Sequence, residues 1–199
     1  GLTIGEYAKM VNGEYWLNDS LQCNLTVIPL GNYDRNNIYE LPVKPSPNLP
    51  NWESVYLYPS LCFFEGTIVS VGRGTEMPFQ VYGHPQIESE YSFTPKQAEG
   101  RNKPLYCDTE CYGKQLQQYA TSYKKNPSKL NLSWIIEAYN QLKDKENFFN
   151  NFFVKLSGTK ELQRQIENGL SEEEIRDSWK EGIDKYKEIR AKYLLYKDF

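Results

Sequence analysis

Residues 44–84 read KPSPNLPNWESVYLYPSLCFFEGTIVSVGRGTEMPFQVYGH, a stretch with only five charged side chains and seven aromatic ones. Glu65 follows the apolar residues 61–64 and precedes a glycine, and Arg73 stands between two glycines. Burying a charge is costly unless it is paired, and glycine lets another group come close. The pattern indicates either a functional site or a structural ion pair that holds a turn, and it does not decide between them.

The length and charge of the whole chain limit its class. With 199 residues it can bury a core of its own. The net charge is -3, from 23 Lys and Arg against 26 Asp and Glu, and no basic stripe marks a nucleic-acid surface. No apolar run approaches the length of a membrane span, and Gly1-Leu2-Thr3 does not open a signal peptide. We therefore expect neither a nucleic-acid partner nor a membrane span.

Four cysteines and one histidine leave little room for metal chemistry. Cys107 and Cys111 could close a small disulfide loop, or they could be two free thiols in a surface loop. Zinc is not expected, because His84 is the sole histidine and no second Cys/His cluster exists. We expect no metal and no cofactor.

The N-terminal residues have the pattern of a helix followed by a strand. Thr3 and Glu6 form a predicted capping box at the start of the helix. Residues 25–28, Leu-Thr-Val-Ile, are apolar and β-branched, as in a buried strand. A helix that feeds a short buried strand is the tail of an α/β unit, so residues 1–43 are predicted to end a domain whose other strands lie elsewhere. Alternatively, the pair completes this chain's own sheet.

Residues 31–51 are predicted to be irregular. Prolines block both helix and central strand there; they are Pro42, Pro45, Pro47 and Pro50. Tyr33, Arg35 and Asn48 also lie in this segment. Long ordered loops are uncommon and often functional, and proline limits mobility, so an ordered loop is favoured over a solvated linker.

The next segment is predicted to form one helix and two strands. Asn51 is expected to cap a helix that runs to about Phe64 and kinks at Pro59. Residues 68–71 and 79–82 read as strands on either side of a loop.

Residues 83–85 end the second of these strands in the same prediction. His84, within them, could contact a ligand, although a lone histidine in a turn is more often simply hydrogen bonded. The polar segment 86–130 has turn signals and a possible strand over residues 114–118.

The last third of the chain is predicted to be helical. Asn131, Thr159 and the pair Ser171 and Glu174 are cap signals for successive helices. The final helix carries a long apolar stripe, formed by Ile175, Trp179, Ile183, Tyr186 and Tyr193. The predicted class is α+β, with an α/β tail at the N-terminus, a small sheet and a helical C-terminal third. The predicted second domain is 44–199.

Five motifs carry a resemblance: residues 44–50 (KPSPNLP), 58–67 (YPSLCFFEGT), 70–75 (SVGRGT), 78–79 (PF) and 83–85 (GHP). They resemble the exo-β-N-acetylmuramidase (NamZ-type) glycoside hydrolase family, formerly a family of unknown function. The opening GLTIGEYAKMVNGE and the closing RAKYLLY are also similar, so the resemblance covers nearly the whole chain.

The resemblance implies a domain arrangement. Members have a Rossmann-like N-terminal domain, a C-terminal domain and an active cleft between them. The chain would match the last helix and strand of the first domain and the whole of the second. The missing N-terminal domain is therefore an expected partner. Relatives often have an acidic residue where Val71 stands, and His84 is not shared by all members.

The resemblance also implies an activity, the release of N-acetylmuramic acid from the non-reducing ends of peptidoglycan fragments. Glycoside hydrolysis usually needs two carboxylates. Glu65, next to two phenylalanines, suits the general acid. No second carboxylate between residues 44 and 84 is convincing, so the partner acid is expected in the missing half. Such an enzyme would be periplasmic or extracellular.

Substrate contacts follow from the same resemblance. Arg73 or Arg35 could hold the lactyl carboxylate of muramic acid through two hydrogen bonds. Tyr33 and Tyr58 could stack on sugar faces. The full set of candidate substrate-binding residues is Arg73, Asn48, Arg35, Tyr33, Tyr58 and His84.

A second hypothesis is a non-catalytic module that binds glycan or packs against a neighbouring domain. The position of Glu65 and Arg73 distinguishes the two. An open cleft with room for a sugar favours the enzyme, and mutual burial favours the module.

Overall fold

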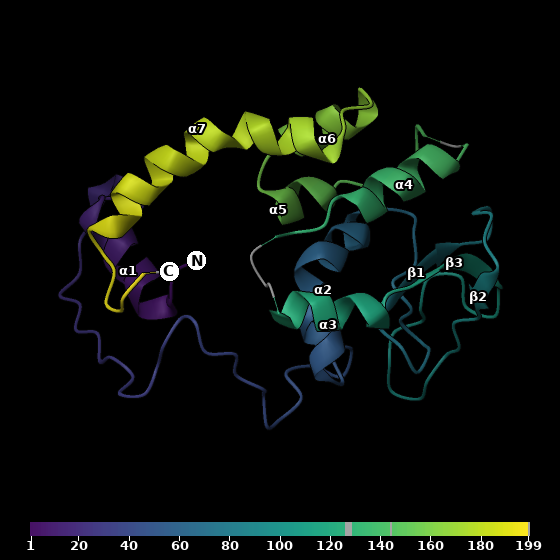
Figure 1. The fold of residues 1–199 in the computed structure, drawn as a ribbon, viewed down its shortest axis with the longest axis horizontal. Helices are drawn as coiled ribbons and strands as arrows, with labels where there is room; N and C mark the ends of the chain where they lie inside the picture. The colour runs from purple at the N-terminus through teal and green to yellow at the C-terminus, as the bar shows by residue number, and fades with distance from the viewer. Residues whose placement is uncertain (126–128, 144, 199) are drawn as a thin grey trace. The chain divides into compact units, whose positions relative to one another are not determined.

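The computed structural model describes residues 1–125, 129–143 and 145–198. These residues form two compact units, Gly1–Tyr39 with Arg176–Phe199 (unit 1) and Glu40–Ile175 (unit 2). The described residues contain seven α-helices and one three-stranded antiparallel sheet (Figure 1), which confirms the α+β class. No helix among them is long and apolar enough to cross a membrane. The predicted boundary between the two domains, at residues 43 and 44, stays a prediction.

Unit 1 begins with α1 (Ile4–Gly13), and the predicted capping box is present. The Glu6 N–H donates to Thr3 Oγ1 at 3.4 Å, and the Thr3 N–H donates to Glu6 Oε2 at 2.7 Å. The helix packs against the C-terminal residues of the chain, because a Cβ at Gly13 would lie 2.5 Å from the Tyr193 hydroxyl. A 3-10 turn, η1 (Asn18–Ser20), follows.

The predicted strand at residues 25–28 is wrong for this chain. The segment has no strand assignment, and Leu25 and Ile28 are exposed. A strand needs a hydrogen-bonding neighbour, and the described residues offer none to this segment. Within this segment, Val27 packs against Gly5 of α1.

Unit 2 begins with α2 (Trp52–Leu61), which runs through Pro59 and passes into the 3-10 turn η2 (Cys62–Gly66). The predicted cap is present, since the Ser54 N–H donates to Asn51 Oδ1 at 3.0 Å. The α-helix ends three residues before the predicted Phe64, and the tighter turn that follows carries Glu65.

The sheet of unit 2 has the order β1-β3-β2, with β1 (Val81–His84), β2 (Tyr91–Phe93) and β3 (Cys111–Gln115). Both neighbours of β3 are antiparallel to it, and Gly113 pairs with Gly83 on one side and Tyr91 on the other.

The strand predictions are only partly right. The strand expected at 79–82 begins two residues later, because Phe79 has a φ of 55°, a turn conformation that a strand excludes. Residues 83 and 84 are the last two of β1, so the strand ends within the predicted segment 83–85. The strand expected at 68–71 is reduced to one bridge between Ser70 and Gly83. The strand expected at 114–118 lies at 111–115.

Five further helices follow the sheet: α3 (Gln117–Lys125), α4 (Ser133–Gln141), α5 (Phe153–Ser157), α6 (Glu161–Glu167) and α7 (Glu172–Ala191). Asn131 Oδ1 accepts from the Trp134 N–H at 3.1 Å, and Thr159 Oγ1 accepts from the Glu161 N–H at 3.1 Å. The Ser171–Glu174 box is also present. The Ser171–Glu174 box thus marks the start of α7, whereas α4 and α6 each begin one residue later than the cap signals at Asn131 and Thr159 predict.

The core of unit 2 is aromatic. Phe148 packs edge-on against both Tyr139 and Phe149, and Phe149 lies against Phe153 with ring centroids 4.5 Å apart. The predicted stripe of α7 is buried at Ile175, whereas Ile183 and Tyr186 are exposed. Phe148, Phe149 and Phe153 thus form part of the packed core of unit 2, as clustered phenylalanines indicate.

Candidate active site

A cavity of about 610 Å³ lies within unit 2. Its wall is built from four segments of the chain: Pro47 and Asn48, residues between 64 and 74, residues between 96 and 105, and Phe152. Its volume lies in the range of small-molecule sites. Both Glu65 and Arg73 are on this wall.

Glu65 is positioned by a partner segment far along the chain. Directly after it, the Ile68 N–H donates to the Phe148 carbonyl at 3.0 Å, and the Asn150 N–H donates to the Gly66 carbonyl at 2.9 Å. The backbone of Phe153 packs so closely on Gly66 that a side chain at residue 66 has no room. The core segment 148–153 thereby fixes the backbone next to Glu65.

Arg73 extends from a tight turn and reaches Glu65. Gly72 and Gly74 on either side have φ angles of 73° and 83°, which favour glycine. The Arg73 guanidinium forms an ion pair with Glu65 and also lies over the Phe79 ring, 5.4 Å from its centroid. The side chains of Arg73 and Glu65 are 47% and 17% exposed. The two residues are thus paired with each other and open to the cavity at the same time.

Gly74 allows another segment of the same chain, residues 96–105, to pack closely against the turn that carries Arg73. The Lys96 N–H donates to the Gly74 carbonyl at 2.8 Å. A Cβ at Gly74 would lie 2.6 Å from the Lys96 carbonyl oxygen and 2.8 Å from Pro104. Gly74 therefore joins the turn of Arg73 to the segment 96–105, which we call the cavity loop.

The cavity loop was missed as a functional element by sequence reasoning, which found only turns there. It contributes Lys96, Glu99, Arg101 and Lys103 to the wall. A turn inside it is closed by the Arg101 N–H, which donates to the Ala98 carbonyl at 3.2 Å. The available signal was three basic residues within eight positions, next to Pro104.

Asn48 is the third predicted residue on the cavity wall. Tyr58 lies on α2 beside Phe79, with ring centroids 5.1 Å apart, and is not among the lining residues. Burial raises the pKa of Tyr58, and the nearby Glu65 carboxylate adds to this effect. Tyr58 therefore lies near Glu65 but does not line the cavity.

His84 is buried in β1 and away from the cavity lining. Its Nδ1 accepts a hydrogen bond from the Gln86 N–H at 3.0 Å, and its ring meets the edge of Tyr106. Burial lowers the pKa of His84, which favours the neutral ring. Of the two alternatives for His84, these contacts support a histidine that is simply hydrogen bonded within the protein over one that contacts a ligand.

Arg35 and Tyr33 belong to unit 1. The Arg35 guanidinium forms an ion pair with Glu6, and these side chains are 3% and 0% exposed. It also donates to the Gly1 carbonyl at 3.1 Å. Tyr33 packs edge-on against Tyr196, with centroids 4.6 Å apart. In this unit both residues have packing partners, and their contact with substrate stays a prediction.

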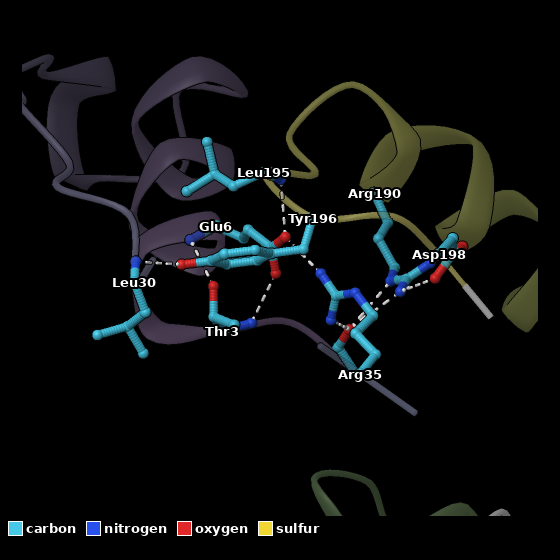
Figure 2. A network of polar contacts seen from close by, with 9 residues as sticks. Thr3, Glu6, Leu30, Arg35, Arg190, Leu195, Tyr196 and Asp198 are labelled. Atoms are coloured by element: carbon cyan, nitrogen blue, oxygen red, sulfur yellow. Dashed lines mark hydrogen bonds and ion pairs between the residues drawn. The ribbon is translucent and has the colours of Figure 1, made fainter. Parts of the chain in front are cut away.

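The Glu6 carboxylate is the centre of that network (Figure 2). Burial acts to raise the pKa of Glu6, but hydrogen bonds from Arg35 and from the N–H groups of Thr3 and Leu195 outweigh burial and lower the pKa to about 2. The network stabilises an ionised carboxylate inside unit 1.

Metal and disulfide chemistry find no support in the described residues. No group of three or more His, Cys, Asp or Glu side chains there could hold a metal ion. Of the two alternatives for Cys107 and Cys111, the structure has the free thiols. The Cys107 thiol donates to Asp108 Oδ2, and Cys111 is buried in β3.

Two family models match nearly the whole chain. The model described as "Exo-beta-N-acetylmuramidase NamZ, C-terminal" matches residues 56–196, and the model described as "Exo-beta-N-acetylmuramidase NamZ, N-terminal" matches residues 1–53. The chain belongs to the NamZ family. The resemblance carried by the sequence motifs is thereby confirmed, and it places the Glu65 and Arg73 motifs in the part that matches the C-terminal model.

Individual NamZ relatives agree with this assignment. The chain is 34% identical to a peptidoglycan β-N-acetylmuramidase NamZ from Bacillus subtilis, over 98% of this chain and 50% of that protein. A DUF1343 family protein from Bacteroides fragilis matches all of this chain and 56% of its own, with 45% identity and a TM-score of 0.90. A second one from the same organism, at 24% identity and a TM-score of 0.71, shares the fold. The chain spans about half the length of the relatives it matches.

Proposed function

We propose that this chain supplies part of the active cleft of a peptidoglycan-recycling glycoside hydrolase, which releases N-acetylmuramic acid from non-reducing ends. The observation that carries the proposal is the Glu65–Arg73 pair on the wall of the cavity of about 610 Å³. Membership of the NamZ family, and the 34% identical relative named as a β-N-acetylmuramidase, give the substrate class.

In this proposal Glu65 is the general acid that protonates the leaving oxygen of the glycosidic bond. The Arg73 guanidinium donates to the Glu65 carboxyl group, and this contact must open before Glu65 can reach the leaving oxygen. A substrate that draws Arg73 towards itself would leave Glu65 free to do so. Arg73 therefore controls the access of the substrate to the acid.

Glycoside hydrolysis usually needs a second carboxylate. Glu99, on the cavity loop, is the one other glutamate or aspartate that lines this cavity among the described residues. It is exposed on the loop, whereas Glu65 is anchored in the wall. We assign the partner acid to the Rossmann-like N-terminal half of the full-length enzyme, and Glu99 is the competing candidate.

The proposed substrate also gives a location. Peptidoglycan lies outside the cytoplasmic membrane, so the proposal places the enzyme in the periplasm or outside the cell. Cell fractionation with an antibody against this chain tests that location.

The function is tested with a chromogenic β-N-acetylmuramide. The full-length protein should hydrolyse it and should release only free N-acetylmuramic acid from peptidoglycan fragments. The 199-residue chain alone should give no turnover, because it lacks the partner acid. If the full-length protein binds the sugar without turnover, the chain is part of a glycan-binding module. Full-rate turnover by the chain alone would place both carboxylates within it.

A further inference from the structure

The cavity carries more positive than negative charge. Its lining contains four cations, Arg73, Lys96, Arg101 and Lys103, and two carboxylates, Glu65 and Glu99. A cavity with this balance is suited to a ligand with a negatively charged group.

Two of the four cations already have carboxylate partners in the protein. Arg73 is paired with Glu65, and Lys96 Nζ lies 2.9 Å from Asp108 Oδ1. The other arginine predicted from the sequence to bind a carboxylate, Arg35, is buried against Glu6. Within residues 1–125, 129–143 and 145–198, neither Arg101 nor Lys103 forms an ion pair. Lys103 is close enough to the Asp108 carboxylate to help lower its pKa, but it makes no direct contact with it, so Arg101 and Lys103 are the two lining cations without a direct carboxylate partner among the described residues.

The cavity loop that carries them is tied to the wall at several points. Its first residue bonds to Gly74, and the Asp108 N–H donates to the Pro95 carbonyl at 2.8 Å just outside it. The Gln97 side chain donates to the Arg101 carbonyl at 2.6 Å. A loop held in this way presents Arg101 and Lys103 without much further ordering on binding, which lowers the entropic cost.

We propose that Arg101 and Lys103 of the cavity loop bind the carboxylate of an acidic sugar and so determine the specificity of this site. The proposal rests on the proposed function, in which that group is the lactyl carboxylate of N-acetylmuramic acid. The planar guanidinium of Arg101 can hold a carboxylate through two parallel hydrogen bonds, and Lys103 adds a point charge.

The test is equilibrium binding to the full-length protein, measured by calorimetry with two sugars. N-acetylmuramic acid carries the lactyl carboxylate, and N-acetylglucosamine lacks it. The double variant Arg101→Gln/Lys103→Gln should bind N-acetylmuramic acid about tenfold more weakly, the loss expected for one charge-assisted contact. Its affinity for N-acetylglucosamine should stay at the wild-type value. Added salt should weaken only the first of these interactions in the wild-type protein.

Lys125→Gln/Lys129→Gln is the matched control, because it also removes two positive charges, at residues outside the cavity lining. It should leave both affinities unchanged, and a thermal melt of each variant confirms folding. The proposal is overturned if the double variant keeps its affinity for N-acetylmuramic acid. It is also overturned if both sugars are weakened equally, because the loop then shapes the cavity without recognising charge.

Failure of the proposed function has a different signature. If the wild-type protein prefers N-acetylmuramic acid through Arg101 and Lys103 but hydrolyses no β-muramide, the specificity assignment holds and the hydrolase does not. If the wild-type protein hydrolyses the muramide and the double variant keeps the same preference between the two sugars, the hydrolase function is supported. The assignment of specificity to Arg101 and Lys103 is then wrong.

Discussion

Two ion pairs between glutamate and arginine occupy different settings in this molecule. Glu6 and Arg35 are almost completely buried in unit 1, and the Glu6 carboxylate also accepts the N–H groups of Thr3 and Leu195. Glu65 and Arg73 line a cavity in unit 2, and among the described residues Arg73 alone donates to Glu65.

The difference separates a structural clamp from a site. A carboxylate whose lone pairs are satisfied inside the protein has none left for a ligand, and removing its partner leaves an uncompensated charge. A carboxylate with one partner, at the edge of a cavity, keeps the capacity to exchange a proton. Residue type is the same in both pairs, so the surroundings decide the role.

The largest expected effect is on catalysis by the full-length enzyme. Glu65→Gln should lower kcat by about 10²–10⁴-fold, the usual contribution of a general acid. The melting temperature should stay near the wild-type value, because a partly exposed ion pair contributes little to stability. Glu99→Gln tests the competing candidate for the partner acid and should keep most of the activity, because we assign that acid to the N-terminal half. A large loss of stability with normal turnover per folded molecule would make Glu65–Arg73 a second clamp.

The next effect is on stability. Arg35→Gln should lower the free energy of unfolding by about 3 kcal/mol, because it leaves the Glu6 carboxylate buried without its cation. Arg73→Gln, with its partly exposed partner, should cost much less. Urea denaturation of both variants gives the two values. If Arg35→Gln is stable but binds substrate weakly, Arg35 regains the role that the sequence analysis gave it.

The buried pair should also give unit 1 an acid sensitivity. The folded pKa of Glu6 is about 2, below its ordinary value of 4.5. A lowered pKa stabilises the fold above the unfolded value, and this stability is lost as the pH falls from about 4.5 towards 2. The loss should approach about 3 kcal/mol. Thermal melts from pH 6 to pH 2 should show a smaller decline for Glu6→Gln than for wild type; equal declines would remove Glu6 as the cause.

Glycine substitutions test how rigidly the wall that carries Arg73 is held. Gly74→Ala should destabilise by about 2 kcal/mol, because its φ disfavours a side chain and its Cβ would meet Lys96 and Pro104. Gly158→Ala is the control, since Gly158 has a φ of 73° but no atom within 4 Å of the added Cβ. It should cost about 1 kcal/mol. Equal costs from calorimetry would show that the loop yields to the new side chain.

The smallest expected effect is at an ion pair that is largely exposed to solvent, which serves as a reference for the two glutamate–arginine pairs. Lys185 and Glu181 form an ion pair on α7, and their side chains are 71% and 81% exposed. Lys185→Gln should leave the melting temperature unchanged, because such exposed pairs are screened by water and salt. A measurable drop would mean that exposure is a poor guide to which pairs in this chain are structural.

Local signals in the sequence predicted helix starts well. The bonds of Thr3, Asn51 and Ser171 span three residues, so sequence alone contains both partners of each cap. The strands were harder, because a strand is defined by a distant neighbour. Residues 25–28 have the composition of a strand but no partner among the described residues, and β2 was not predicted at all.

The grouping of the candidate residues was predictable to a similar extent. Glu65, Arg73 and Asn48 do meet on one cavity. The cavity loop was not foreseen, because its position depends on a backbone bond from Lys96 to Gly74, more than twenty residues earlier. Arg35 and Glu6 could not be recognised as a clamp, since neither the capping box nor the proline-rich segment shows that they meet.

The pairing that fixes Glu65 has a consequence for the order of folding. The Ile68 N–H and the Phe148 carbonyl that it meets are 80 positions apart in the sequence. At about 5–20 residues per second, a ribosome needs about 4–16 s to synthesise the chain between them. During that interval the backbone beside Glu65 lacks its partner segment, and the loop that must close is long. The wall that carries Glu65 is therefore completed late, after α2 and all three strands of the sheet are already available.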